Sequence, residues 1–292
     1  MKRFQEVMYT YIHDRSFEML SAGIFCMMLA LNAPALIQTS ARYAARVPRA
    51  KHVLDVYAPP GALARTVVVF VHGGGLTEGD RSWYRATGRS LANGGYVAVV
   101  PSYRYYPAVH PLDSARDIVA ALEWVAEHIA ALGGDPRKVV LAGHSAGGWL
   151  VDLVMMDRAL WRGTAYARAP VAAAVYFSGD FADIIEPAPG ESAADRAVDA
   201  MIEGPPGRGR RPLSPDSYPA ARVPWFLVCA THDDPGTCDD RDAFARALRQ
   251  AAVPVQTFTD GGTHMGEIVH LHTRGSALRT AFDSWLKNVV HL

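Results

Sequence analysis

Ser145 lies in a short motif whose residue types suit nucleophilic catalysis. The segment GHSAG at 143–147 follows the apolar run KVVLA at 138–142 and precedes a segment with helical character that begins near Ala146. A G-x-S-x-G sequence between a strand and a helix is typical of a sharp turn that exposes the serine hydroxyl. A free hydroxyl is a weak nucleophile near neutral pH, so this serine would need a base and a stabiliser for the oxyanion. The motif alone is a weak indicator because glycine and serine are common in turns.

A glycine loop upstream supplies the expected oxyanion stabiliser. HGGG at 72–75 follows the β-branched run TVVVFV at 66–71. An HGGG loop before the serine is typical of the oxyanion hole of ester hydrolases, because glycine lets backbone N–H groups approach the substrate. We expect the N–H groups of Gly74, Gly75 and Ala146 to be the donors. The alternative interpretation, an ordinary glycine turn with a buried histidine, becomes weak once both motifs are present.

The base and its acid should follow the serine in the order acid, then histidine. THDDP at 231–235 follows the run WFLVCA, and DGGTH at 260–264 follows VQTFT. His264 would take the serine proton, and an aspartate would fix its tautomer and stabilise the imidazolium. Side chains of neighbouring residues point in different directions, so only one of two adjacent aspartates can face the histidine. We predict a triad of Ser145, Asp234 and His264, with Asp233 as a loop-capping residue.

Alternating strands and helices must bring these loops together. Continuous apolar runs predict strands buried on both faces, and apolar residues spaced by three and four predict helices. The strands are expected at 52–57, 66–71, 96–100, 138–142, 171–177, 225–230 and 255–259. The helices are expected at 80–92, 114–132, from about 146, at 239–251 and at 276–290. This order predicts an α/β fold with a mostly parallel central sheet and helices on both faces. Loops at the carboxyl ends of such strands meet at one edge, where ligands bind.

The amino-acid composition limits the classes of protein to which the chain can belong. The 292 residues are 50% apolar and 20% charged, with 29 basic and 29 acidic side chains. A high apolar fraction excludes a disordered chain, and a balanced charge removes the electrostatic argument for a nucleic-acid partner. We divide the chain into an N-terminal apolar segment at 1–40 and a catalytic domain at 41–292. The domain carries a short insertion at about 178–224, rich in Pro, Gly and Arg.

The N-terminal apolar segment is open to several interpretations. The uncharged run 19–31 is 13 residues long and can be extended to 37. This is shorter than the roughly 20 residues of a membrane-spanning helix, and it matches the hydrophobic region of a secretory signal. The mixed charges before it argue against a signal, and a helix that contacts a membrane or covers the site is the alternative. Localisation is therefore left open between cytoplasmic and exported or membrane-associated.

Three cysteines are too few for a disulfide scaffold or a cysteine-based zinc site. Cys229 and Cys238 flank a single loop, so they could pair if the chain is exported. In a reducing cytoplasm we expect them to stay as thiols.

The assembled motifs resemble those of a known family. HGGGLTEGDRSWY, PSYRYYP, GGDPRKVVLAGHSAGGWL, THDDP and GGTHMGEI are similar to segments of the α/β-hydrolase carboxylesterases. Hormone-sensitive-lipase-like esterases, feruloyl-esterase-like enzymes and isoprenylcysteine methylesterases are the most similar groups. The resemblance runs from about His52 to the C-terminus and implies an α/β-hydrolase fold. It implies Ser145 as nucleophile, Asp234 as acid and His264 as base. Kynurenine formamidases are similar too, but their HGGxW loop would have tryptophan where this chain has Leu76.

We therefore expect a serine carboxylic-ester hydrolase that works through an acyl-enzyme, on small to medium acyl or aryl esters. An aryl formamidase or amidase on the same triad is the alternative, and a hydrolase-fold binding protein without chemistry is a remote one. No nucleotide motif follows a strand, so we expect no cofactor and no metal. The oligomeric state is not predicted.

Other chemically suggestive residues have simpler interpretations. His270 and His272 lie near His264, but no cysteine or acidic cluster has ligand spacing with them, so we expect no metal site. We expect His144 to pack under the turn rather than react. The basic residues at 208–211 are interpreted as a solvated loop.

Overall fold

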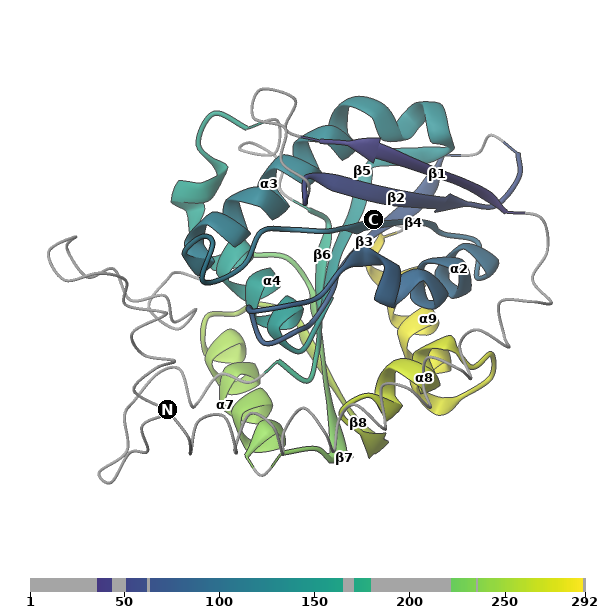
Figure 1. Cartoon of the computed structure of the whole chain (residues 1–292). Helices are drawn as coiled ribbons and strands as arrows, with labels where there is room; N and C mark the ends of the chain where they lie inside the picture. Colours follow the sequence, from purple (N-terminus) through teal and green to yellow (C-terminus); the bar gives the residue numbers. More distant parts are fainter. Residues whose placement is uncertain are drawn as a thin grey trace, which may run out of the picture.

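A computed structural model describes residues 36–43, 51–61, 64–164, 171–179, 222–234 and 236–290. Its strands form one eight-stranded sheet with the order β1-β2-β4-β3-β5-β6-β7-β8 (Figure 1). The strands are β1 (Ile37–Arg42), β2 (Val53–Ala58), β3 (Arg65–Val71), β4 (Val97–Pro101), β5 (Gly134–His144), β6 (Ala173–Phe177), β7 (Trp225–His232) and β8 (Val255–Thr263).

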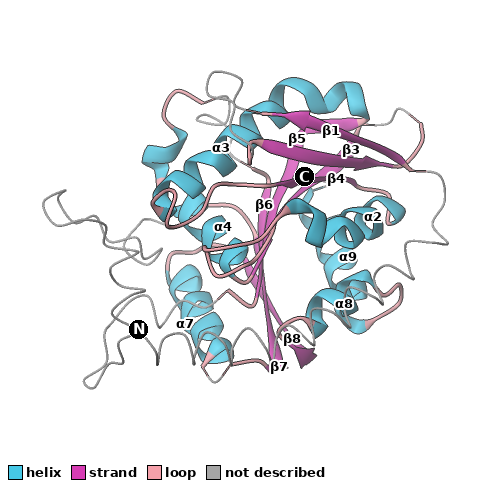
Figure 2. Cartoon of the chain, viewed as in Figure 1, coloured by secondary structure: helices cyan, strands magenta, loops and turns pink. Residues whose placement is uncertain are grey.

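Helices cover both faces of this sheet. Helices α3, α4 and α7 lie on one face, and α2, α8 and α9 lie on the other (Figures 1 and 2). Their bounds are α2 (Arg85–Asn93), α3 (Pro111–His128), α4 (Ala146–Met156), α7 (Thr237–Gln250), α8 (Gly266–His272) and α9 (Ala277–Val290). Three 3₁₀ turns accompany them at Arg81–Tyr84, Ile129–Leu132 and Arg158–Trp161.

The sheet is parallel wherever it carries the predicted loops. β3 pairs in parallel with β4 and β5, and the parallel ladder continues through β6 and β7 to β8. Only β1 with β2 and β2 with β4 are antiparallel among the described strands. The predicted fold class, a mostly parallel sheet between two helix layers, is confirmed.

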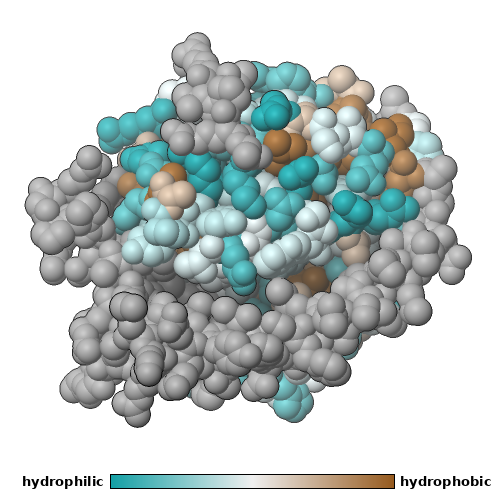
Figure 3. All heavy atoms as spheres, viewed as in Figure 1, coloured by the Kyte–Doolittle hydropathy of each residue, from teal (hydrophilic) through white to brown (hydrophobic). Residues whose placement is uncertain are grey.

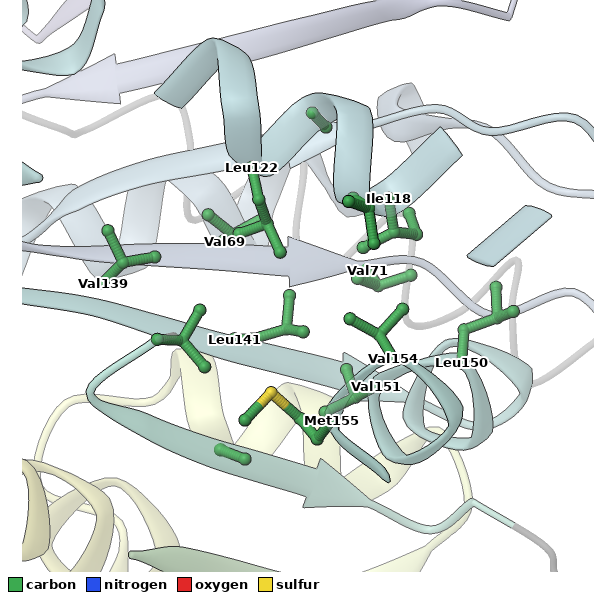
Figure 4. Packing of buried hydrophobic residues seen from close by; sticks show 14 of the residues in the cluster. Val69, Val71, Ile118, Leu122, Val139, Leu141, Leu150, Val151, Val154 and Met155 are labelled. Atoms are coloured by element: carbon green, nitrogen blue, oxygen red, sulfur yellow. The ribbon is translucent and has the colours of Figure 1, made fainter. Parts of the chain in front are cut away.

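The apolar runs of the sequence form the two layers of core. Apolar residues of β3 and β5 pack against α3 and α4, as Val69 and Leu141 of the strands and Leu122 and Val154 of the helices show (Figure 4). Each such fully buried side chain contributes about 1.5–3 kcal/mol to folding. On the face drawn in Figure 3 the described residues are mostly hydrophilic, and the hydrophobic ones form small separate areas. The buried contacts of β3 and β5 with α3 and α4 give the sheet edge that carries the loops a rigid core.

The structure adds two elements that we did not predict. β1 has the polar sequence IQTSAR and pairs only with β2 at the edge of the sheet, so it lacks the apolar signature of a buried strand. α8 has seven residues, too few for a helical period to stand out. The predicted helix at 114–132 begins earlier, at Pro111, and its last turn is the 3₁₀ turn Ile129–Leu132.

Several predictions concern residues outside the described part of the chain. The apolar segment at 19–37 lies outside it except for its last two residues, and Ile37 begins β1. Most of the insertion at 178–224, with its basic residues at 208–211, also lies outside. Among the helices that are described, none combines the length and the apolar character required to cross a bilayer.

A disulfide joins Cys229 of β7 to Cys238 of α7, the two residues for which we predicted pairing only in an exported chain. Their sequence separation is nine residues, so the bond closes a short loop after the end of β7. Closing a loop of this size in the unfolded chain is worth about 2–3 kcal/mol by the chain-entropy model.

We expect reduction of this disulfide to lower the free energy of unfolding by about 2–3 kcal/mol. Urea unfolding with and without dithiothreitol measures the change. The third cysteine provides the control, because Cys26→Ser should leave the effect of the reductant unchanged. A Cys229→Ala/Cys238→Ala variant that is as sensitive to the reductant as the wild type would contradict the assignment.

Candidate active site

Ser145 occupies a strained turn between β5 and α4. Its backbone angles are φ 56° and ψ −130°, although it is not glycine. Such a conformation costs on the order of 1–3 kcal/mol and persists only where the surroundings impose it. Here the Ser145 N–H donates to the carbonyl of Phe177 (2.8 Å), and the Trp149 N–H donates to the Ser145 carbonyl (3.1 Å). The turn is therefore fixed on one side by β6 and on the other by the first turn of α4.

The two glycines of the G-x-S-x-G motif are required by close backbone contacts. A Cβ at Gly143 would lie 2.2 Å from the carbonyl oxygen of Gly147. A Cβ at Gly147 would lie 2.3 Å from the carbonyl oxygen of Val71, the last residue of β3. No side chain can be accommodated at either distance, since both neighbours are backbone. The serine turn is thus pressed against the end of the strand that leads into HGGG.

The HGGG loop lies directly beside Ser145. A Cβ on Gly73 would come within 3.0 Å of the Ser145 Cβ. Gly74 and Gly75 have φ of 129° and 57°, in the region that favours glycine. The loop closes on itself because the N–H groups of Thr77 and Glu78 both donate to the Gly74 carbonyl. The predicted donors Gly74 and Gly75 therefore lie in the loop that borders the serine, and Ala146 is the first residue of α4.

The side chain of His72 stabilises this loop. Its ring is buried, stacks on Tyr103 at 4.2 Å between centroids, and donates from Nδ1 to the Gly73 carbonyl (2.8 Å). The Tyr103 hydroxyl donates to the His72 carbonyl (2.9 Å). Burial lowers the pKa of His72 to about 4, so its ring is neutral at pH 7. His72 is a structural residue of the loop.

His264 pairs with Asp233, not with Asp234. His264 Nδ1 lies 2.9 Å from both carboxylate oxygens of Asp233. The prediction of Asp234 as the partner of His264 is therefore wrong. The cause is the strand register. His232, the last residue of β7, is paired with Thr263, the last residue of β8, so Asp233 and His264, which follow them, come side by side. The Asp234 N–H donates to Asp233 Oδ1 (2.8 Å), which makes Asp234 part of the turn that holds its neighbour.

The charge of Asp233 is stabilised by this pairing. Burial alone would raise the pKa of Asp233, but the hydrogen bond and charge of His264, with the Asp234 N–H, lower it to about 2. The carboxylate is therefore ionised at neutral pH. An anion here orients the His264 ring with Nδ1–H toward the carboxylate, which leaves Nε2 as the acceptor.

A second carboxyl group, that of Glu267, is buried beside His144, and our sequence analysis did not single it out. It is fully buried on α8, and its Oε1 lies 3.5 Å from Nε2 of His144. Burial raises the pKa of Glu267 well above its usual range; a hydrogen bond with Ser178 opposes this rise, and repulsion from Asp233 and Asp260 adds to it. We therefore assign Glu267 as a neutral acid at pH 7, beside an ionised Asp233. Glu267 lies in the segment GGTHMGEI, which carries the family resemblance, but the residue types around it indicated no role for a carboxyl group.

His270 and His272, the two histidines that follow His264 in the sequence, have hydrogen-bond partners of their own. His270 Nδ1 lies 2.7 Å from Asp260 Oδ2, and His272 Nε2 lies 2.7 Å from the Thr87 hydroxyl. Burial lowers the pKa of His272 to about 3. Within the described residues, no three His, Cys, Asp or Glu side chains are grouped as metal ligands.

We expect Glu267→Gln to stabilise the fold increasingly as the pH rises from about 5 to about 8. Above its usual pKa of 4.5 the unfolded chain releases the Glu267 proton while the folded chain keeps it, so wild-type stability falls with rising pH. The neutral amide removes this loss. The difference in free energy of unfolding between variant and wild type should grow by at most about 1.4 kcal/mol per pH unit.

Chemical denaturation across this pH range measures the difference. Glu127→Gln, at an exposed position of α3, is the matched control and should give a difference that grows less with pH than that of Glu267→Gln. A Glu267→Gln difference that is constant or shrinks toward pH 8 would show that Glu267 is ionised in the folded state.

Known proteins share segments and shape with this chain. It is 32% identical over 108 residues to a probable isoprenylcysteine alpha-carbonyl methylesterase of Arabidopsis thaliana, which covers 37% of this chain and 26% of that protein. It is 43% identical over 96 residues to a carboxylesterase of Mycobacterium tuberculosis, which covers 32% of this chain and 30% of that protein. The matched segments thus span between a quarter and a third of these relatives.

Solved structures match over nearly the whole chain, at low identity. Esterase B of Lactobacillus rhamnosis superposes with a TM-score of 0.77 at 19% identity, covering 100% of this chain and 97% of that one. Esterase 2 of Thermogutta terrifontis superposes with a TM-score of 0.63 at 23% identity, covering 87% and 92%. At such identities the likeness shows the fold.

The family profile described as alpha/beta hydrolase fold matches residues 68–266, which include the glycine loop, the serine turn and the histidine loop. This match covers more than half of the 292 residues. The chain belongs to the α/β-hydrolase fold family.

Proposed function

We propose that this protein is a serine carboxylic-ester hydrolase that acts through an acyl-enzyme. The observation that carries the proposal is the strained Ser145 turn against the HGGG loop, with the His264–Asp233 pair on the same sheet edge. Sequence relatives named as carboxylesterase and methylesterase support the same reaction class. Neither a metal nor an organic cofactor is part of the mechanism.

The reaction divides between these side chains as follows. Ser145 Oγ attacks the ester carbonyl carbon and gives its proton to His264 Nε2. The oxyanion of the tetrahedral intermediate is held by the N–H groups of Gly74, Gly75 and Ala146, each worth about 3 kcal/mol in the barrier. Asp233, which replaces Asp234 in our assignment, stabilises the imidazolium. The C–O bond breaks, the alcohol leaves with the His264 proton, and water attacks the acyl-serine by the reverse route.

Small to medium acyl groups or aryl esters are the proposed substrates. Structures of the similar esterase B carry a tributyrin phosphonate inhibitor, and those of the similar Thermogutta esterase carry propionate or butyrate. The formamidase alternative is disfavoured at Leu76, which is buried with φ 59° where those enzymes have tryptophan. Rates on a nitrophenyl butyrate and on an aryl formamide separate the two reactions.

We expect Ser145→Ala to lower ester hydrolysis by at least about 10⁴-fold while the fold is kept. A fluorophosphonate probe should label the wild type and fail to label the variant. Ser114→Ala, at a buried serine of α3, is the matched control and should keep both activity and labelling. Undiminished hydrolysis by Ser145→Ala would refute the nucleophile, and a wild type that neither hydrolyses esters nor takes up the probe would point to a binding protein.

We expect Asp233→Asn to lower kcat by about 10³–10⁴-fold, because the amide favours the wrong tautomer of His264. Asp234→Asn is the matched control at the adjacent position, and its kcat should stay within a few-fold of the wild type. Steady-state kinetics on one nitrophenyl ester measures both. The opposite ranking would return the acid to Asp234.

A further inference from the structure

A buried chain of hydrogen bonds runs behind the proposed site and joins its three loops. The Gly73 N–H donates to the Tyr84 hydroxyl (3.2 Å). The Tyr84 hydroxyl lies 2.7 Å from His144 Nδ1, and His144 Nε2 lies 2.8 Å from the carbonyl oxygen of His264. Tyr84 and His144 are both almost fully buried, so none of these bonds is exchanged freely with water. The chain begins in the HGGG loop, passes through the serine turn and ends at the histidine loop.

The direction of every bond in this chain follows from its two ends. The His264 carbonyl can only accept, so His144 Nε2 must carry a hydrogen. In a neutral ring Nδ1 is then the acceptor, so the Tyr84 hydroxyl donates to His144 Nδ1 while its oxygen accepts from the Gly73 N–H. A neutral His144 protonated on Nε2 therefore satisfies all four groups. Glu267, the carboxyl group near Nε2, is neutral by burial, so it requires no charge on His144.

The sheet by itself does not join these loops. In the strand order, β6 and β7 lie between β5, which ends in the serine turn, and β8, which ends at the histidine loop. The backbone ladder thus leaves two strands between the loop of His264 and that of Ser145. The side chain of His144 crosses this distance, and its ring lies 4.6 Å from that of His264 between centroids, with the two planes tilted by 49°.

We propose that Tyr84 and His144 are positioning residues for ester hydrolysis, which set the HGGG loop and the His264 loop in register around Ser145. Neither side chain touches the substrate. The inference rests on the proposed function. It assigns a role to His144, the x position of the G-x-S-x-G motif, and to Tyr84, to which the sequence analysis gave no role. A misplacement of about 1 Å in a reacting group can cost on the order of 100-fold in rate.

Tyr84→Phe tests the chain with the least change of shape. It removes one hydroxyl and keeps the ring that packs against Phe70 at 5.5 Å between centroids. The matched control is Tyr43→Phe, because Tyr43 is equally buried and its hydroxyl donates to the Ser102 carbonyl, outside this chain of bonds. Tyr84→Phe loses two buried hydrogen bonds and Tyr43→Phe loses one, so both melting temperatures should fall, that of Tyr84→Phe by more.

We expect Tyr84→Phe to lower kcat on nitrophenyl butyrate by about 10- to 100-fold with KM within about threefold of the wild type. Tyr43→Phe should keep both constants. At His144, Gln places an amide nitrogen near the position of Nε2 and keeps the bond to the His264 carbonyl, whereas Asn reaches only toward Tyr84. The expected order of kcat is therefore wild type, then His144→Gln, then His144→Asn.

The possible outcomes separate this inference from the function on which it rests. If the wild type hydrolyses the ester and takes up the fluorophosphonate at Ser145, but Tyr84→Phe matches Tyr43→Phe in kcat, the positioning role is refuted and the hydrolase stands. Equal kcat for His144→Gln, His144→Asn and the wild type would refute it as well, even if Tyr84→Phe does not fold. A wild type without activity or labelling would refute both proposals.

Discussion

The site depends on one close contact between two backbone segments. At this contact the serine turn lies directly against the end of β3. Gly147 lies so close to the carbonyl of Val71 that a single methyl group would separate the two segments. The same approach brings Gly73 against Ser145 and holds the serine at a positive φ that its side chain would otherwise avoid. The strain is carried by α4 and β6, whose hydrogen bonds fix the turn from both sides. The parallel sheet supplies the rigid base that this arrangement requires.

Two nearby carboxyl groups differ in protonation state at neutral pH because their electrostatic environments differ. Asp233 faces His264 and is ionised, whereas Glu267 is fully buried, is repelled by Asp233 and Asp260, and keeps its proton. Environments that push two pKa values apart are a common device of active sites. Here this difference leaves one negative charge, that of Asp233, beside the His264 ring, and no charge on Glu267 near His144. The imidazolium that forms during the reaction would therefore be stabilised from one side only, along Nδ1.

Much of this arrangement was readable from the sequence, and the exceptions have physical causes. The apolar runs and their glycine ends located the strands and the loops of Ser145 and His264, because buried parallel strands have a strong local signature. The choice between Asp233 and Asp234 depends on the register of β7 with β8, a contact between distant segments that adjacent residues do not encode. Tyr84 and Glu267 lie within segments that carry the family resemblance, but their partners come from distant parts of the chain and are acquired only in the folded protein. β1 escaped prediction because an exposed edge strand needs no apolar alternation.

The central claim is that a covalent acyl-serine forms at Ser145 during turnover. Rapid quenching of the protein with excess nitrophenyl ester, followed by peptide mass spectrometry, tests it most directly. The account predicts a burst of nitrophenol close to one per chain and an acyl group on the peptide that contains Ser145. Steady hydrolysis without a burst, or an acyl group carried by another residue, would contradict it.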